Sequence, residues 1–260
     1  MKKIISILLF SLCFYQPGYN QDTVQLRILT YNIYHGATMN GDFNLDTIAN
    51  RIAFHNPDLV AMQEVDRLTN RARKMDLVTE LGYRTKLAPL FGRAMYYDSG
   101  EYGEGILSKY SFIKTTNHPL PALPEHEPRA ALEVLICLPS GDTIAFVGTH
   151  FEHNRNAPDR VTQAEKLAEL YRDYPYPVIL AGDLNDTPES EAMSRIFEVF
   201  TPSYGKNPLP TIPSDQPRKK IDYILTDKNH NWRIVETQVI CDKVVSDHCG
   251  YLAVIELIKN

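Results

Sequence analysis

Apolar residues along the chain gather in short runs that are bounded by Gly, Pro, Asn, Asp or Ser. Such runs, about four to eight residues long, are typical of buried β-strands. The segments expected as strands are 26–33, 59–65, 105–107, 131–138, 144–149, 178–181, 221–225, 234–240 and 251–258. The pattern therefore predicts a protein built mainly from buried sheet.

Apolar positions at helical spacing lie between some of these runs. One stripe covers residues 45–52, and a second covers 161–171, with Pro158 placed to begin its first turn. A short helix over 191–197 is predicted to begin with Thr187 as its N-cap. Several strands follow one another without a helix, which excludes a simple alternating βα barrel. Mixed sheets with helices on their outer faces fit the pattern better.

Two proline-rich segments, 118–128 and 207–217, interrupt the strands. Because strands resume directly on both sides of each segment, we interpret them as long surface loops of one domain and not as linkers. Loops of this length often carry functional residues.

The N-terminus has the pattern of a secretory signal peptide. Lys2 and Lys3 precede an apolar run at 4–14, which is about half the ~20 residues that a transmembrane helix requires. We therefore expect a signal peptide over residues 1–20, with an approximate end, and one domain over 21–260. This predicts export to the periplasm or the cell exterior, with no transmembrane segment in the mature chain.

Cysteine usage adds an open question. A lipid-anchored form through Cys13 is disfavoured, because Leu12 is bulky where a small residue is preferred. Cleavage would leave Cys137, Cys241 and Cys249, which permit at most one internal disulfide. None of the spacings resembles a zinc site. We expect Cys137 and Cys241 to act as small buried hydrophobic residues.

Composition and charge narrow the class of partner. The 260 residues are 43% hydrophobic and 23% charged, which are ordinary values for a soluble globular protein. Formal net charge is −5, and the chain contains no long basic run. A strongly basic nucleic-acid surface is therefore not expected, although a local basic groove is compatible with this balance.

Acid, amide and imidazole side chains stand at the ends of several expected strands. These residues are Asn32, His35, Glu64, His150, Asp183, Asn185, Asp222, Asp247 and His248. Each alone could be a turn residue or a buried core group, but buried carboxylates need cations or donors. Strand ends that meet at one rim would supply both. Glu64, Asp183 and Asp247 are oxygen ligands of the kind that Mg²⁺ prefers.

Other catalytic motifs are absent from the sequence. It contains no G-x-S-x-G, so a serine hydrolase would lack its nucleophile. It also contains neither a P-loop nor a G-x-G-x-x-G.

The chain carries, in this order, the motifs TYNIYHG, MQEVD, YGEGILSKYSF, PRAALEV, THFEHN, GDLNDTP, IDYIL and SDH, within a stretch that covers essentially residues 25–258. This series resembles the endonuclease/exonuclease/phosphatase superfamily, in its branch of exported, metal-dependent hydrolases. The resemblance implies a four-layer α/β/β/α sandwich, with two mixed β-sheets packed face to face and helices outside. It also implies an active site at one rim of the sheets.

The resemblance assigns roles to the metal and to the attacking water. Glu64 resembles the principal ligand of Mg²⁺ or Mn²⁺, with Asn32 and Asp247 beside it. Asp183 resembles the group that orients or deprotonates the water. Asn185 resembles the residue that holds this water or a phosphate oxygen.

The resemblance also assigns phosphate contacts. His248 resembles a phosphate-contacting imidazole with Asp222 as its carboxylate partner, and His150 resembles a second phosphate-binding histidine. Arg129 stands where the family often places a phosphate-facing arginine. A salt bridge at a strand start is the alternative for Arg129.

Three further positions bear on the substrate. His35 and Lys220 flank the expected site and could hold a phosphate or a headgroup, although the run 218–220 could equally be a solvated loop. Glu104 stands where relatives often carry an uncharged residue. Its carboxylate would repel an anionic substrate if it faced the site.

These features together predict an exported Mg²⁺- or Mn²⁺-dependent phosphoesterase, with a phosphodiester favoured over a monoester. A small molecule or lipid headgroup is favoured as substrate, and a nuclease acting on DNA or RNA is the alternative. A non-catalytic binding module on the same fold would be expected to lack at least one catalytic residue. We expect a monomer.

Overall fold

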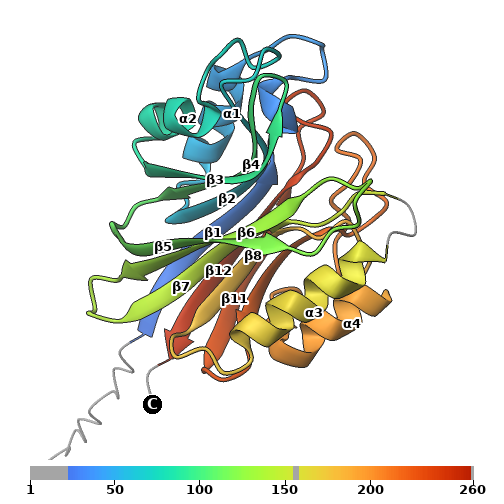
Figure 1. Ribbon diagram of the computed structural model, residues 1–260. Helices are drawn as coiled ribbons and strands as arrows, with labels where there is room; N and C mark the ends of the chain where they lie inside the picture. The colour runs from blue at the N-terminus through green and yellow to red at the C-terminus, as the bar shows by residue number, and fades with distance from the viewer. Residues whose placement is uncertain (1–22, 155–157, 259–260) are drawn as a thin grey trace, which may run out of the picture.

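The computed structural model describes residues 23–154 and 158–258. The expected signal peptide and Cys13 lie outside these residues. Two mixed β-sheets of six strands each stack face to face, and helices lie on their outer sides (Figure 1). The four-layer sandwich that the sequence predicts is therefore confirmed. Within the described residues, no helix is long and apolar enough to cross a lipid bilayer.

The first sheet has the strand order β11-β12-β1-β2-β4-β3. β1 and β2 pair in parallel, and the other neighbours pair antiparallel. Its strands are β1 (Thr23–Asn32), β2 (Leu59–Arg67), β3 (Ala88–Tyr97), β4 (Gly100–Ser108), β11 (Trp232–Ile240) and β12 (Gly250–Ile258). Helices α1 (Leu45–Phe54) and α2 (Leu77–Thr85) pack on its outer face. A short 3₁₀ helix, Tyr34–Gly36, follows β1.

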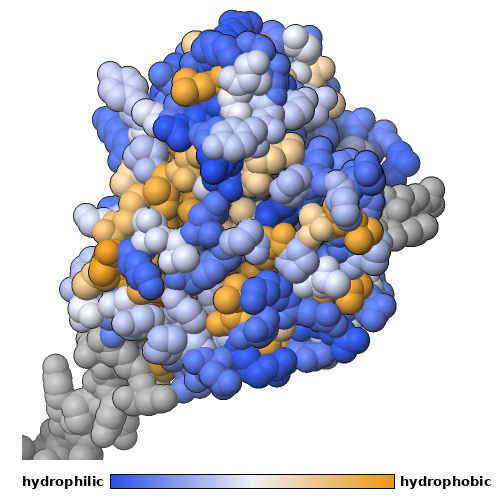
Figure 2. All heavy atoms as spheres, viewed as in Figure 1, coloured by the Kyte–Doolittle hydropathy of each residue, from blue (hydrophilic) through white to orange (hydrophobic). Residues whose placement is uncertain are grey.

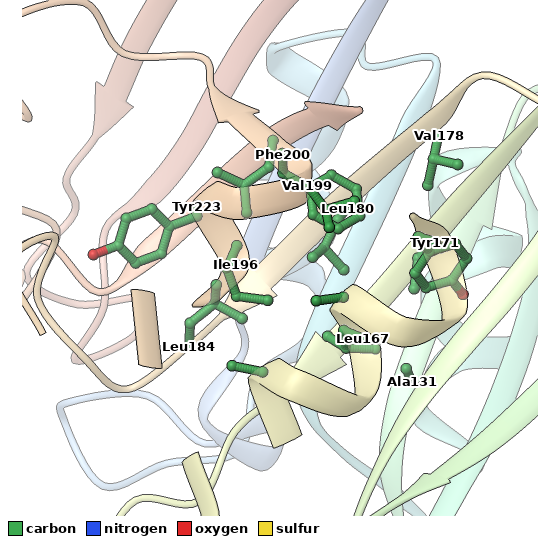
Figure 3. Close-up of a cluster of buried hydrophobic side chains, with 14 of the residues drawn as sticks. Ala131, Leu167, Tyr171, Val178, Leu180, Leu184, Ile196, Val199, Phe200 and Tyr223 are labelled. Atoms are coloured by element: carbon green, nitrogen blue, oxygen red, sulfur yellow. The ribbon is translucent and has the colours of Figure 1, made fainter. Parts of the chain in front are cut away.

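The second sheet has the strand order β5-β6-β7-β8-β10-β9, with β7 and β8 parallel. Its strands are β5 (Phe112–Leu120), β6 (Arg129–Cys137), β7 (Thr143–His150), β8 (Val178–Asp183), β9 (Phe200–Pro202) and β10 (Asp222–Asp227). Helices α3 (Asp159–Tyr171) and α4 (Glu191–Val199) cover its outer face. Figure 3 shows Leu167 and Ile196 of these helices packed toward Leu180 of β8.

Central strands are buried on both faces, and this explains their unbroken apolar runs. On β1, Leu26 and Ile28 face the second sheet, whereas Leu29 and Tyr31 face the helices. Ile106 of β4 joins the same inter-sheet core. The face of the molecule shown in Figure 2 is mostly hydrophilic, with smaller apolar patches between the polar side chains.

Every predicted strand and helix is present, and the structure adds elements that the pattern did not predict. These are β3, β5, β9 and α2. β5 is an edge strand with mostly exposed or half-buried residues, so it lacks an apolar run. The predicted cap of the 191–197 helix is wrong: Ser190, and not Thr187, accepts the hydrogen bond from the Met193 amide, at 3.3 Å.

The prediction of at most one internal disulfide agrees with the structure, but the prediction that Cys137 and Cys241 are small buried hydrophobic residues is wrong. Cys137 is exposed at the end of β6, and Cys241 forms a disulfide with Cys249. The two paired cysteines directly follow and precede the last rung between β11 and β12, so strand pairing brings them together. The 207–217 segment is not purely a surface loop, because Thr211 and Ser214 are buried within it.

Candidate active site

Three polar side chains lie side by side at one end of the second sheet. His150 ends β7, Asp183 ends β8 and Asp222 begins β10. The register pairs His150 with Asp183 and Asp183 with Asp222, and each residue is at most 3% exposed. Backbone hydrogen bonding between neighbouring strands therefore fixes the spacing of this row.

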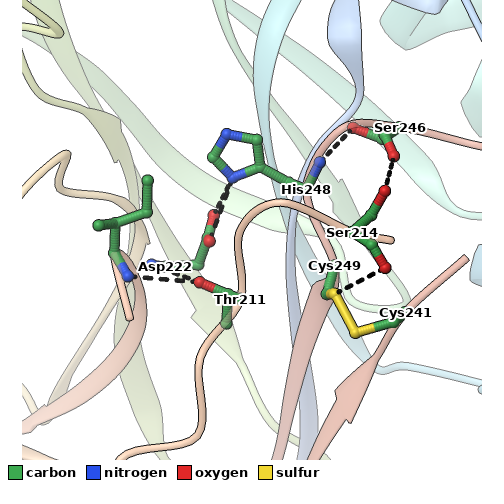
Figure 4. Close-up of a disulfide and its surroundings, with 8 residues drawn as sticks. Thr211, Ser214, Asp222, Cys241, Ser246, His248 and Cys249 are labelled. Atoms are coloured by element: carbon green, nitrogen blue, oxygen red, sulfur yellow. Dashed lines mark hydrogen bonds and ion pairs between the residues drawn. A yellow bond between two sulfur atoms is a disulfide. The ribbon is translucent and has the colours of Figure 1, made fainter. Parts of the chain in front are cut away.

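His248 completes an ion-paired triad with two of these acids. Its Nδ1 lies 3.1 Å from both carboxylate oxygens of Asp222 (Figure 4). Its Nε2 lies 3.6 Å from Asp183 Oδ2. Burial lowers the pKa of His248, but the charges of Asp222 and Asp183 outweigh burial and raise it to about 10. The ring is therefore an imidazolium at neutral pH, able to donate a proton from Nε2.

Asp183 is the central carboxylate of the site. Burial raises its pKa to about 7, although the charge of His248 opposes this, and Asp222 adds to the increase. Its Oδ1 accepts a hydrogen bond from the Asn185 backbone amide at 2.9 Å, and its Oδ2 accepts one from Asn32 Nδ2 at 3.3 Å. A carboxylate with a pKa near 7 is suited to accept a proton from water.

His150 is held in its neutral state. Burial and the nearby charge of Arg129 keep the pKa of His150 well below its usual range. Arg129 can only donate, and its Nη1 lies 3.1 Å from Nδ1 of His150. Nε2 of His150 lies 3.5 Å from Asp183 Oδ2 and 2.9 Å from the side-chain amide nitrogen of Asn185, so both ring nitrogens face donors and the neutral ring can accept at only one of them.

Asn185 reaches this position through an unusual backbone conformation. Its φ is +51°, in the left-handed region that Asn tolerates better than most residues. Its side-chain nitrogen also donates to the carbonyl of Phe151 at 3.0 Å. The side chain of Asn185 therefore reaches the site because the backbone turns through a left-handed conformation, and not because the strand continues beyond Asp183.

The first sheet contributes the other half of the site. Asn32 Nδ2 bridges Glu64 Oε1, at 3.1 Å, and Asp183 Oδ2, so it joins the two sheets. Glu64 lies in a bulge of β2 with φ +57°, where the register with β4 shifts. His35 Nδ1 lies 3.3 Å from Glu64 Oε2. Burial alone would raise the pKa of Glu64, but the bonds from His35 and Asn32 lower it overall, so Glu64 is ionised.

The donor set around Glu64 fits a hard divalent cation. Glu64 and Asp247 are half-buried, and their carboxylate oxygens are the kind of ligand that Mg²⁺ or Mn²⁺ prefers. Burial raises the pKa of Asp247, and nearby Glu64 adds to this although His248 opposes it. A cation between the two acids would relieve their repulsion. With Asn32, these residues are the ones predicted from the sequence to hold the metal.

A second cluster could also hold a cation on distance alone. Asp183, Asp222 and His248 place possible ligand atoms within 4.8 Å of one another. The ring nitrogens of His248 are instead both taken up by carboxylates, Nδ1 by Asp222 and Nε2 by Asp183, as in an ion pair. We therefore interpret this cluster as an ion-paired triad.

A cavity of about 320 Å³ opens above these groups. Seven residues predicted from the sequence line it: His35, Glu64, Arg129, His150, Asp183, Asn185 and His248. Six that were not predicted also line it: Arg71, Met95, Tyr97, Tyr102, Glu127 and His153. Asp222 and Asn32 are fully buried and are not part of this lining; Asp222 acts through its bond to His248.

Lys220 is not one of the residues that line this cavity. It is 3% exposed, and its Nζ lies 3.1 Å from the centre of the Tyr251 ring, a cation–π contact. Burial lowers its pKa to about 7, although Asp222 opposes this. The expectation that Lys220 contacts a phosphate or headgroup directly is therefore not supported by its position.

Glu104 does not face the cavity either. Its carboxyl group is fully buried, and neither oxygen has a hydrogen-bond partner among the described residues. Burial holds its pKa well above the usual range, despite the opposing charge of Arg129. A neutral, buried carboxyl does not repel an anionic substrate by direct contact.

The fold and site together define a class: a two-sheet hydrolase sandwich with carboxylates and imidazoles converging at one rim. The model of the Endonuclease/Exonuclease/phosphatase family matches residues 29–248. The chain belongs to this family.

Individual relatives agree with this assignment. The protein is 26% identical to the uncharacterized protein YbhP of Escherichia coli over 214 residues, which cover 76% of this chain and 83% of that protein. A family structure from Beutenbergia cavernae superposes with a TM-score of 0.77 at 20% identity, covering 90% of this chain and 72% of the other. The mannosyl-6-phosphatase Bt3783 of Bacteroides thetaiotaomicron gives 0.71 at 18% identity, covering 88% and 99%. At these identities the structures establish the fold alone.

Proposed function

We propose that the protein is an exported, divalent-metal-dependent phosphoesterase that favours phosphodiesters. The observation that carries this proposal is the ion-paired triad of Asp183, His248 and Asp222, of which Asp183 and His248 line the cavity. It places a proton acceptor and a proton donor 3.6 Å apart on the same wall.

The side chains support in-line attack of water on phosphorus. Asp183 would orient the water and take its proton as the new P–O bond forms; the P–O bond to the ester oxygen breaks at the same time, and the departing alkoxide takes up a proton from solvent to leave as the alcohol. The imidazolium of His248, held by Asp222, would donate to a phosphate oxygen as negative charge develops there. Asn185 would hold the water or a phosphate oxygen, and Arg129 would add positive charge at the cavity wall.

A divalent cation held by Glu64, Asp247 and Asn32 would stabilise the charge on the phosphate oxygens and on the departing alcohol. All five residues whose loss would indicate a non-catalytic binding module are present and lie together. They are Glu64, Asp183, Asn185, Asp222 and His248.

Export is supported by two independent features. The N-terminal segment has the charged and apolar pattern of a signal peptide. The Cys241–Cys249 disulfide is of a kind that persists in oxidising compartments such as the periplasm or the cell exterior.

A small-molecule or lipid-headgroup substrate is supported over nucleic acid. The chain carries a formal net charge of −5, which disfavours broad attraction to a polyanion. The cavity of about 320 Å³ lies near the lower end of the range for small-molecule sites. Bt3783, with the same fold, is named for action on a sugar phosphate.

A phosphoester panel tests the proposal. It contains bis-p-nitrophenyl phosphate, DNA, RNA, sphingomyelin and inositol phosphates, each with Mg²⁺, Mn²⁺ or EDTA. We expect metal-dependent hydrolysis that EDTA abolishes. Asp183→Asn should lower kcat by about 10²–10⁴-fold, the usual contribution of a general base.

Asp186→Asn is the matched control, because Asp186 is close by but pairs with Arg160 at 3.0 Å. It should retain near wild-type turnover. Turnover by Asp183→Asn at the wild-type rate would refute the assigned role. Hydrolysis in EDTA equal to that in Mg²⁺ would refute the metal dependence. DNA cleavage well above the other rates would establish a nuclease.

A further inference from the structure

One wall of the cavity is formed by Arg71, Met95 and Tyr97, which lie outside the recognised motifs, and by Tyr102, the first residue of the YGEGILSKYSF motif. Arg71 follows β2, Met95 and Tyr97 lie in β3, and Tyr102 lies in β4. None of these is needed for the attack on phosphorus described above. This wall therefore has a different task, and the contacts of Arg71 indicate which one.

The guanidinium of Arg71 is held rigidly. Its Nε and Nη2 donate to the two oxygens of Asp66, at 2.7 Å and 2.9 Å. Asp66 is fully buried and also accepts a bond from Thr69, at 2.6 Å. The Arg71 guanidinium carbon lies 4.6 Å from the centre of the Tyr97 ring and 5.6 Å from that of Tyr102. The side chain is nevertheless 32% exposed.

This arrangement leaves one edge of the guanidinium available. Nη1 donates to no described residue, and Nη2 keeps a second hydrogen. Two such donors on a planar fork match two neighbouring oxygens, as in a phosphate, a carboxylate or a pair of vicinal hydroxyl groups.

The charges around the cavity favour neutral hydroxyl groups. Asp66 already balances the charge of Arg71. The other arginine of the cavity lining, Arg129, is likewise paired, with Glu127 at 2.8 Å, so little unbalanced positive charge is left to hold a second anion. Hydroxyl groups can accept from Arg71 and also donate to a carboxylate such as Glu127.

The same wall also offers apolar surface. Tyr97 is 40% exposed, and Met95 lies beside it on the cavity lining. A sugar or cyclitol ring has C–H faces that pack on such side chains and hydroxyl edges that need donors and acceptors. An alkyl chain would leave the Arg71 donors unpaired in the cavity, which costs affinity.

We propose that the alcohol part of the substrate carries a polyhydroxylated ring, a sugar or a cyclitol, bound by Arg71 and Tyr97. This inference rests on the proposed phosphoesterase function. Arg71 is the specificity-determining residue, because its fixed fork pairs with two vicinal hydroxyl groups.

Matched substrate pairs test the proposal and distinguish the possible sources of the ring. Glycerophosphoinositol is compared with glycerophosphoethanolamine, and a hexose 6-phosphate with hexyl phosphate. Phosphatidylinositol vesicles are compared with phosphatidylethanolamine vesicles. Products are followed by phosphorus NMR in Mg²⁺. In at least one pair, kcat/KM for the ring-bearing member should exceed that of its partner by at least tenfold.

Two variants and one control locate the preference on the wall. Arg71→Lys keeps the charge but loses the planar fork, and Tyr97→Ala removes the exposed ring. Each should reduce the ring preference at least fivefold, mainly through KM. Tyr96→Ala should leave the preference unchanged, because Tyr96 is 74% exposed and lies outside the lining of this cavity. Tyr97→Ala covers the case in which Arg71→Lys fails to fold.

Distinct outcomes separate this inference from the proposed function. Equal rates within every pair, or faster cleavage of single-stranded DNA than of any ring-bearing member, would overturn the ring subsite alone. So would hydrolysis of bis-p-nitrophenyl phosphate without hydrolysis of any ring-bearing member. Absence of turnover on every phosphoester would overturn both. Higher rates on a hexose bisphosphate than on the hexose 6-phosphate would also overturn the ring subsite, because they would show that the Arg71 guanidinium binds a second phosphate and not hydroxyl groups.

Discussion

His248 keeps its positive charge because two carboxylates face its two ring nitrogens. Its pKa, raised to about 10, means that the proton is present through neutral pH and lost only as the pH rises through about 10. We expect kcat/KM to fall along an alkaline limb near this value. In His248→Gln, overall activity should drop by about 10²-fold or more, and the limb should disappear. A limb that persists unchanged in this variant would mean that another group titrates.

The buried carboxyl group of Glu104 should lower the free energy of unfolding at neutral pH. Its pKa in the folded protein is above the value of an exposed carboxyl, so the folded state binds more protons than the unfolded state above about pH 4.5. Stability attributable to this group therefore falls as the pH rises above that value. Glu104→Gln should raise the free energy of unfolding by about 1 kcal/mol or more at pH 8.

Denaturant unfolding at pH 4 and pH 8 measures this effect. The gain should shrink toward pH 4, where the carboxyl is protonated in both states. Glu236→Gln, on the exposed face of β11, is the control and should show neither the gain nor its pH dependence. An equal gain at both pH values would mean that shape, and not ionisation, is responsible.

At the scale of elements, the connection from β11 to β12 carries Asp247 and His248 and is closed by the Cys241–Cys249 disulfide. Closing a loop this short removes unfolded-chain entropy worth about 2–3 kcal/mol. Replacing both cysteines by serine should lower the unfolding free energy by up to this amount and reduce kcat. The Cys137→Ser control should change neither, because Cys137 is exposed and unpaired among the described residues. Unaltered stability and kcat in the double variant would show that β-pairing alone holds this connection.

Elements buried on both sides were predictable, because their sequences are apolar at nearly every position. β1, β2 and β8 are examples, with cores on both faces. β5 was not predictable, since an edge strand needs few apolar residues. α2 is short and carries few apolar residues, so its helical stripe was too weak to identify.

The site was predictable where function requires a polar residue at a strand end, as for Asp183 and His150. The bulge that aims Glu64 has no local sequence signal, and it arises from pairing between β2 and β4. Arg71 and Tyr97 also lack such a signal, because only the tertiary fold brings their segments to the cavity. Lys220 shows the reverse error: a charged run suggested solvent or substrate, but aromatic rings enclose its last lysine.

At the scale of the whole molecule, the two sheets share one apolar interface and one site. Ile106 is fully buried in that interface, and Trp232, the one tryptophan of the chain, packs against its margin. We therefore expect a single cooperative unfolding transition. Tryptophan fluorescence and far-UV circular dichroism should give coincident midpoints. Ile106→Ala should lower both together, at a cost of about 2–5 kcal/mol. Midpoints separated by several degrees would indicate that the sheets unfold independently.

The row formed by His150, Asp183 and Asp222 has a consequence for protein engineering. Neighbouring strands are about 4.8 Å apart, and the three side chains stand in one row across the adjacent strands β7, β8 and β10. The spacing between these side chains is therefore set by the strand spacing, and lengthening a loop cannot increase it. Sliding one strand by a single residue would turn the functional side chain on that strand to the opposite face of the sheet. A designer who wants a larger reaction centre must change which strand carries a group. Variation in the loops and in β3 remains free to alter what the centre accepts.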